Sequence, residues 1–220
     1  MIKLVKGEKP QELTDNAEKW TKEYCDCLAK GVKPSEGLAK RYNSPAIRKA
    51  LEKETFEKCA YCESKVKHNS YGDVEHILPK RKDARPDLYV EWSNLTIACE
   101  ICNRSGKKSY YNADLPLINP YEDDPSQVLQ DVGNFIFPII GNRRAEISEK
   151  ILKLNRAELI ERREDRIRHI ESLLQSWDKE DNMDMKKVLL QELHEESKEE
   201  KEFSSTVKAF LTIRGLPPLR

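Results

Sequence analysis

Two identical cysteine pairs constrain this chain more than any other feature of its sequence. Cys59 and Cys62 form one C-x2-C pair, Cys99 and Cys102 form the other, and 36 residues lie between the pairs. Each pair can present two thiolates from one tight turn, and two such turns complete a tetrahedral sulfur shell that suits Zn²⁺. A redox C-x-x-C is expected once, near a βαβ pattern. The spacing therefore predicts a structural zinc site, with four unliganded core cysteines as the alternative.

The other two cysteines and the apolar content bear on the compartment. Cys25 and Cys27 lie on an expected helix, where a C-x-C pair is poorly placed to bind one zinc ion with both sulfurs. We therefore expect them to be ordinary side chains without a metal-binding role. The first 14 residues hold no apolar stretch that is long enough for a signal peptide. The chain also has no run of about 18 apolar residues, so we expect no membrane association. A cytoplasmic location with reduced thiols follows as an expectation.

The segment between the cysteine pairs holds residue types that hydrolysis of a phosphodiester requires. His76 follows Glu75 in the β-prone run "GDVEHILPK", and Asn94 and Asn103 come later. A histidine can deprotonate water near neutral pH. A carboxylate and an amide oxygen can hold catalytic Mg²⁺ or Mn²⁺. The plain alternatives are a buried core histidine, a turn at Asn94 and a helix start at Asn103; a turn is also expected around His68.

Basic residues cluster although the chain is neutral overall. With 39 basic and 39 acidic side chains, the total charge gives no support for nucleic-acid binding. The runs "KRKDAR" at 80–85 and "RSGKK" at 104–108 are nevertheless strongly basic, and cationic clusters can hold a polyanion. They could equally be a flexible loop and a solvated helix face. The candidate nucleic-acid-binding residues are Lys80, Arg81, Lys82, Arg104, Lys107 and Lys108.

The pattern "C-x2-C … DVEHILPK … WSNL-x3-C-x2-CN-x3-KK" over residues 59–108 resembles the HNH (ββα-metal) endonuclease family with a four-cysteine zinc knuckle. The resemblance implies that His76 is the general base and that Glu75 and Asn103 bind the catalytic ion. It implies that Asn94 fixes the loop and orients the histidine. Glu75 stands where the family more often has Asp or His, and Asp73 is expected to be a support residue or minor ligand.

The fold expected from these features is α+β and mostly helical, with a zinc-stabilised ββα-metal core. A helix is expected to open at Ser44-Pro45, and a hairpin around residues 131–134. Asn155 is expected to cap a long helix that runs to about residue 179. Its near-heptad apolar stripe packs on the same chain or, alternatively, on a partner. The expected regions are 1–58 (helical), 59–110 (nuclease core), 111–144 (loops and hairpin) and 145–220 (helical, with a possible docking surface).

The layout of the whole chain resembles a narrower HNH subgroup, the nuclease subunits of two-component Septu-type anti-phage systems, some of them associated with retrons. This resemblance implies an ABC/SMC-like ATPase partner. We therefore expect a metal-dependent endonuclease that cuts DNA. One alternative is cleavage of RNA, such as a tRNA, because no residue reports on the 2′-hydroxyl. A non-enzymatic zinc-ribbon adaptor is the other alternative.

Overall fold

The computed structural model describes residues 1–66 and 72–216. It has the mostly helical α+β architecture that the sequence predicts, with two separate two-stranded sheets among the described residues. The turn expected around His68 lies outside the described residues. None of the described helices is long and apolar enough to cross a membrane.

Three helices form the N-terminal part: α1 (Gln11–Ala29), α2 (Glu36–Lys40) and α3 (Pro45–Glu54). As expected, α3 opens at Ser44, whose hydroxyl accepts a hydrogen bond from the Ile47 amide, with proline in the first helical position. Helix α1 begins at Gln11, and Leu13 in its first turn is fully buried as part of its apolar face.

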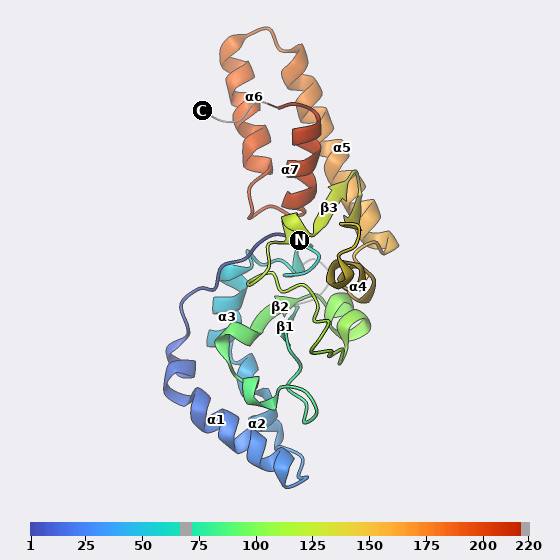
Figure 1. Ribbon diagram of the computed structural model, residues 1–220. Coiled ribbons are helices and arrows are strands. Elements are labelled where there is room, and N and C mark those ends of the chain that lie inside the picture. Colours follow the sequence, from blue (N-terminus) through green and yellow to red (C-terminus); the bar gives the residue numbers. More distant parts are fainter. Residues whose placement is uncertain (67–71, 217–220) are drawn as a thin grey trace.

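A small antiparallel sheet lies at the centre of the region between residues 59 and 110 (Figure 1). It consists of β1 (Asp73–His76) and β2 (Leu95–Ala98), and Glu75 pairs with Thr96 while His76 pairs with Leu95. Two short 3₁₀ turns, η3 (Pro86–Leu88) and η4 (Trp92–Asn94), lie in the connection, and the π-helical segment η5 (Ile101–Lys107) follows β2. The order β1, loop, β2, helical segment is the expected ββα unit. Its apolar face and the N-terminal helices share one core.

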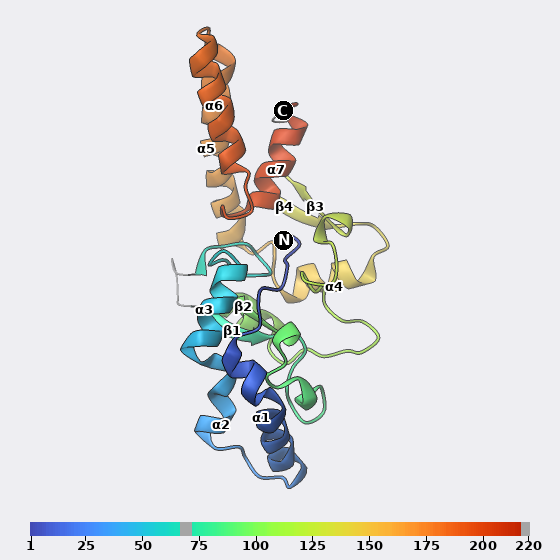
Figure 2. The same cartoon turned by 90° about the vertical axis from the view of Figure 1, so that its left-hand side faces the viewer.

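In the C-terminal part, a hairpin of β3 (Leu129–Val132) and β4 (Phe135–Pro138) precedes four helices: α4 (Arg143–Ile151), α5 (Ala157–Lys179), α6 (Met183–Glu196) and α7 (Ser204–Ile213). The hairpin and α4 join the main core, while α5, α6 and α7 form a second, smaller core. Ile170 and Leu174 of α5 pack against α6 and α7, so this part of the α5 stripe is used within the chain. Figures 1 and 2 show the α5–α6 pair projecting away from the body.

The expected cap of α5 is wrong. Helix α5 begins at Ala157, and no side chain caps it. The Asn155 side chain instead pairs with β4, since its Oδ1 accepts from the Ile136 amide at 2.9 Å and its Nδ2 donates to the Ile136 carbonyl at 2.7 Å. Asn155 therefore stabilises the hairpin edge, a non-local role that is absent from the helix pattern.

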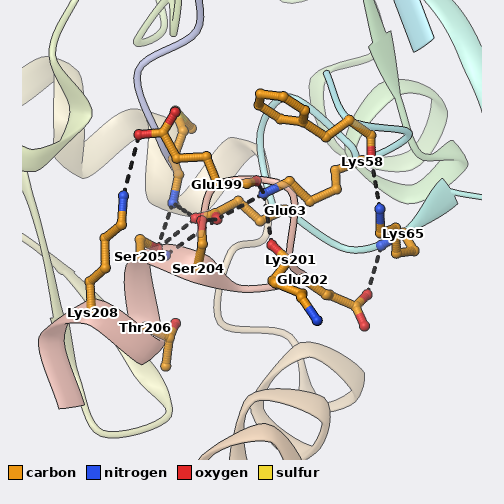
Figure 3. Close-up of polar contacts among 12 residues, drawn as sticks. Lys58, Glu63, Lys65, Glu199, Lys201, Glu202, Ser204, Ser205, Thr206 and Lys208 are labelled. Carbon is orange, nitrogen blue, oxygen red and sulfur yellow. Dashed lines mark hydrogen bonds and ion pairs between the residues drawn. The ribbon is translucent and has the colours of Figure 1, made fainter. Parts of the chain in front are cut away.

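A buried polar cluster joins the first cysteine pair to the start of α7 (Figure 3). Glu63 is only 2% exposed; it accepts hydrogen bonds from the Ser204 and Ser205 hydroxyls and pairs with the Met1 ammonium at 2.7 Å. Lys58 lies 3.5 Å from the same carboxylate and donates to carbonyls at 199 and 201. Burial alone would raise the pKa of Glu63, but the neighbouring cations hold it well below its usual value.

We expect Glu63→Gln to destabilise the protein by about 3–5 kcal/mol, because it leaves buried cations without their counter-charge. The measurement is urea unfolding at neutral pH. Glu36→Gln is the matched control: Glu36 pairs with Lys40 on an exposed helix face, so its loss should leave the midpoint unchanged. An unchanged midpoint for Glu63→Gln would show that the cluster contributes no net stability.

Candidate active site

The four cysteines of the two C-x2-C pairs come together. Their sulfur atoms all lie within 4.8 Å of one another, the single such cluster of metal-binding side chains among the described residues. The Cys62 and Cys99 Sγ atoms are 3.8 Å apart. A tetrahedral Zn²⁺ ion with bonds of about 2.3 Å has sulfur–sulfur edges of about 3.8 Å. The cluster therefore fits a tetrahedral zinc shell, whereas Cys25 and Cys27 lie outside it on α1.

Arg156 packs against three of these sulfur atoms. Its guanidinium nitrogens lie 3.6 Å from Cys102 Sγ, 3.8 Å from Cys62 Sγ and 3.7 Å from Cys99 Sγ. Although burial disfavours its charge, the nearby sulfurs raise the pKa of Arg156 above its usual value. Arg156 can thus offset the negative charge of a four-thiolate site. It also ties that site to the start of α5.

His76 has a fixed ring orientation. The side chain is 7% exposed, and Nε2 lies 2.8 Å from the Tyr89 carbonyl oxygen. Because a carbonyl oxygen can only accept, Nε2 carries the proton and Nδ1 is the acceptor. Nδ1 receives no hydrogen bond from a described residue, so its lone pair stays available to a proton. This is the arrangement that a general base requires.

Two aromatic rings lie beside the imidazole. Tyr42 contacts it edge-on at 4.5 Å between centroids, and the Tyr89 ring is nearly parallel to it at 6.5 Å. Lys80 Nζ lies 3.4 Å from the centre of the Tyr42 ring, and burial lowers the pKa of Lys80 to about 7. Burial, followed by the Lys80 charge, lowers the pKa of His76 well below its usual value. The imidazole is therefore neutral at pH 7.

Asn94 clasps the loop that follows β1. Its Oδ1 accepts from the Leu78 amide at 2.8 Å, and its Nδ2 donates to the Leu78 and Leu88 carbonyls at 2.9 and 3.3 Å. The side chain is 4% exposed. Leu88 directly precedes Tyr89, whose carbonyl contacts His76. The Asn94 hydrogen bonds therefore support the imidazole orientation indirectly.

Glu75 and Lys107 form a buried ion pair. Lys107 Nζ contacts Glu75 Oε1 and donates to the His76 carbonyl at 2.6 Å. Both side chains are nearly inaccessible, at 3% exposure for Lys107 and 7% for Glu75. Burial raises the pKa of Glu75, and the Lys107 charge opposes this. Lys107 was expected on a nucleic-acid-binding surface, but its side chain lies inside, beside the expected catalytic carboxylate.

Asn103 lies on η5 beside Asp73 of β1. Its Nδ2 donates to Asp73 Oδ2 at 3.1 Å, and Arg104 holds the same carboxylate from two nitrogens at 2.7 and 2.8 Å. The neighbouring η5 backbone runs so close to α4 that a Cβ atom on Gly106 would lie 2.6 Å from the Ile151 oxygen. Arg81, Lys82, Arg104 and Lys108 are exposed, as expected, while Lys80 is half-buried.

Comparison with known proteins adds to this geometry. The HNH endonuclease family pattern matches residues 59–109. Septu protein PtuB of Bacillus mycoides is 32% identical over 201 residues, which is 78% of this chain and 67% of that protein. Septu protein PtuB of Bacillus thuringiensis is 37% identical over 128 residues, 57% of this chain and 44% of that protein. The chain belongs to the PtuB family and carries its HNH endonuclease domain.

The HNH assignment makes this chain a phosphodiester hydrolase. The chain spans about two thirds of the first PtuB relative and less than half of the second. No solved structure matches it.

Three contributors to this PtuB-type site were missed by sequence reasoning. Tyr42 and Arg156 lie outside the HNH match, and Tyr89 holds His76 through a backbone atom that no side-chain pattern records. Tyr42 gave no signal, because a lone tyrosine after a helix is common. Arg156 gave none either, since it is one of many basic residues near α5.

Proposed function

We propose that this chain is the DNA-cutting, metal-dependent HNH nuclease subunit of a two-component Septu-type anti-phage system. The observation that carries the proposal is the orientation of His76, with Nε2 held by the Tyr89 carbonyl and Nδ1 left as the proton acceptor. The family membership supports the defence role and an ABC/SMC-like ATPase partner. Structural Zn²⁺ at the four cysteines belongs to the same proposal.

In this proposal His76 is the general base. Its neutral imidazole accepts a proton from water at Nδ1 while Nε2 keeps its own proton on the Tyr89 carbonyl. Tyr42 and Tyr89 restrict rotation of the ring, and the Asn94 clasp keeps the loop in place. Positioning of this kind lowers the entropy cost of bringing water to the phosphate.

Glu75 and Asn103 are the proposed ligands of the catalytic cation. The donor set fits, because both residues supply oxygen atoms, which Mg²⁺ and Mn²⁺ prefer. The Asn103 Nδ2 donates to Asp73, so its Oδ1 is available to a cation. The Lys107 ammonium pairs with Glu75 Oε1, so a divalent ion bound at Glu75 would share this carboxylate with Lys107 or displace it. A bound divalent ion would neutralise charge on the leaving 3′-oxygen.

The exposed cations near this centre are the proposed contacts to the nucleic-acid backbone. Arg81, Lys82 and Lys108 are solvent-exposed, and Arg104 is 64% exposed although it pairs with Asp73. Each phosphate contact adds affinity that falls as salt concentration rises. Lys107 acts differently, since its buried ammonium orients Glu75 and the His76 backbone.

Asn103→Ala is the test of the cation site. We expect it to weaken the apparent Mg²⁺ affinity by about 10- to 100-fold or more, because losing a ligand costs at least as much as losing an outer-shell partner. The assay titrates Mg²⁺ against cleavage of supercoiled plasmid, with the chain alone and together with the proposed ATPase partner. Parallel lanes with total RNA distinguish a DNA nuclease from an RNA nuclease.

Asn16→Ala is the matched control, because the Asn16 side chain donates to the Glu12 carbonyl within its own helix α1. It should keep the wild-type metal dependence. Equal Mg²⁺ curves for Asn103→Ala and the wild type would remove Asn103 from the cation site. Cleavage of RNA without cleavage of plasmid would contradict the DNA assignment but leave the phosphodiester hydrolase assignment intact.

A further inference from the structure

A cavity of about 300 Å³ adjoins the catalytic centre and has no part in the function described so far. Ile77 and Leu78, which follow His76 directly, form part of its wall, and Asn94 and Lys107 form another part. Lys107 also contacts Glu75, so one side chain links the cavity wall to the proposed cation ligand. A group held there would lie next to the bond being cut.

The walls of the cavity suit a flat aromatic ligand. Tyr61, Tyr110 and Tyr111 line it together with aliphatic side chains, including Leu88 and Ile118. Aromatic and apolar walls with a few fixed polar groups are typical of small-ligand sites, and about 300 Å³ is at the lower end of their size range. Stacking on tyrosine is the usual way in which proteins hold an unpaired nucleobase.

The unpaired Tyr61 hydroxyl indicates a polar ligand. Tyr61 is 1% exposed, and its hydroxyl oxygen is buried without a hydrogen-bond partner. A buried hydroxyl without a partner costs free energy, so such groups are rare and call for an explanation. Base edges carry donors and acceptors in the ring plane that can pair with such a hydroxyl.

Cations at the cavity suit the phosphate that accompanies a base. Arg144 is fixed there by Asp123, with nitrogen–oxygen distances of 2.7 and 3.0 Å, and by the Pro116 and Leu117 carbonyls. Arg85 is the second cation and pairs with Asp87 at an exposed position. Aromatic walls with neighbouring arginines match one nucleotide of a strand.

We propose that this cavity receives one unpaired nucleobase of the substrate strand beside the scissile phosphate, so that the nuclease prefers single-stranded or locally unpaired sites. The proposal rests on the proposed nuclease function and deepens it. A base that stays paired and stacked in a duplex cannot enter the cavity. Extracting it costs a few kcal/mol, and a mismatch, bulge or single strand lowers that cost.

Cleavage of matched oligonucleotides is the first test. After the cut position has been mapped by sequencing product ends, the same sequence is supplied as single strand, bulged duplex and perfect duplex. We expect the unpaired forms to be cut about 10- to 100-fold faster, the fold-change that a few kcal/mol of extraction produces. Equal rates, or a faster perfect duplex, would overturn the proposal.

An abasic scan across the two positions on each side of the cut is the second test. We expect one position at which removing the base lowers kcat/KM by about 5- to 150-fold, as expected for loss of one stacked base. Tyr111→Ala should lower kcat/KM for the intact strand and leave the abasic strand unchanged. Tyr61→Phe should do the same to a smaller extent, because it removes only the hydroxyl. Phe137→Ala removes a half-exposed ring on β4 and is the matched control. Equal loss on intact and abasic strands would overturn the proposal.

Binding by His76→Ala separates the cavity from catalysis. An oligonucleotide with 2-aminopurine at the scanned position should change its fluorescence on binding, and Tyr111→Ala should abolish that change. If the fluorescence changes but no strand is cut by the wild-type protein, the proposed nuclease function fails while the base site stands. If cleavage occurs without base dependence, only the cavity assignment fails. Free nucleoside monophosphates should compete only weakly; tight binding of them would assign the cavity to a free nucleotide and overturn the assignment to the substrate strand.

Discussion

His76→Ala is expected to lower the rate of nucleic-acid cleavage by about 10²- to 10⁴-fold, the usual contribution of a positioned general base. The physical reason is the divided role of the ring: Nε2 is committed to the Tyr89 carbonyl, so Nδ1 is the atom that can take a proton from water. The measurement is the single-turnover rate on plasmid or on the oligonucleotide that the wild type cuts best, at saturating Mg²⁺.

Loss of the buried ring also costs packing against Tyr42 and Tyr89, so the fold of the variant is checked in parallel by circular dichroism and zinc content. His169→Ala is the matched control, since His169 is exposed on α5, and it should cut at the wild-type rate. A folded His76→Ala protein that cleaves as fast as the wild type would remove His76 from the reaction. A loss in both histidine variants would point to a general effect on the fold.

The sequence predicts the centre of the site well because its signals are local. The two C-x2-C pairs are short turns, and the strands at Asp73–His76 and Leu95–Ala98 are short β-prone runs next to them. Turn geometry and strand propensity act over a few residues. Cysteine spacing therefore predicts that four sulfurs converge, and strand propensity predicts that an acid and a histidine share one strand.

Contacts made across the fold escape the same reasoning. Arg156 reaches the sulfurs from a point 54 residues beyond Cys102, and Tyr42 reaches His76 from the N-terminal helices. Lys107 belongs to a basic run that is typical of a solvated face, yet η5 turns its side chain inward onto Glu75. Which member of a basic run is buried depends on the helix register and on neighbouring elements such as α4. Neither can be read directly from a single sequence.

Asn155 shows the same limit from the other side. Asparagine before a helix is a strong local signal for a cap, and here the competing interaction wins, because the β4 backbone offers Asn155 both a donor and an acceptor. A side chain that satisfies two buried backbone groups of a strand removes a larger penalty than one that caps an exposed helix end. Tertiary satisfaction of the backbone therefore overrides the local preference.

Replacing both Cys59 and Cys62 with serine is expected to unfold the nuclease region and abolish zinc binding. Structural Zn²⁺ contributes about 10–16 kcal/mol in small zinc-binding peptides, while a whole domain is stable by only about 5–15 kcal/mol. The β1–β2 sheet is two short strands, too small to hold itself together. The measurements are metal content by mass spectrometry and thermal unfolding, with one zinc per chain expected for the wild type and none for the variant.

Cys25→Ser is the matched control, because Cys25 lies on α1 outside the cluster, and it should keep both zinc and melting temperature.

Chelation separates the two proposed metals. Brief EDTA treatment should stop cleavage reversibly, with full recovery on adding Mg²⁺ and no change in melting temperature. Prolonged chelation that strips zinc should lower the melting temperature, and Mg²⁺ alone should then fail to restore cleavage. Two results together would exclude a structural role for the four cysteines: a wild-type chain without zinc, and equal melting temperatures for the wild type and the serine variant. The convergence of the sulfurs within 4.8 Å would then contribute nothing to the stability of the fold.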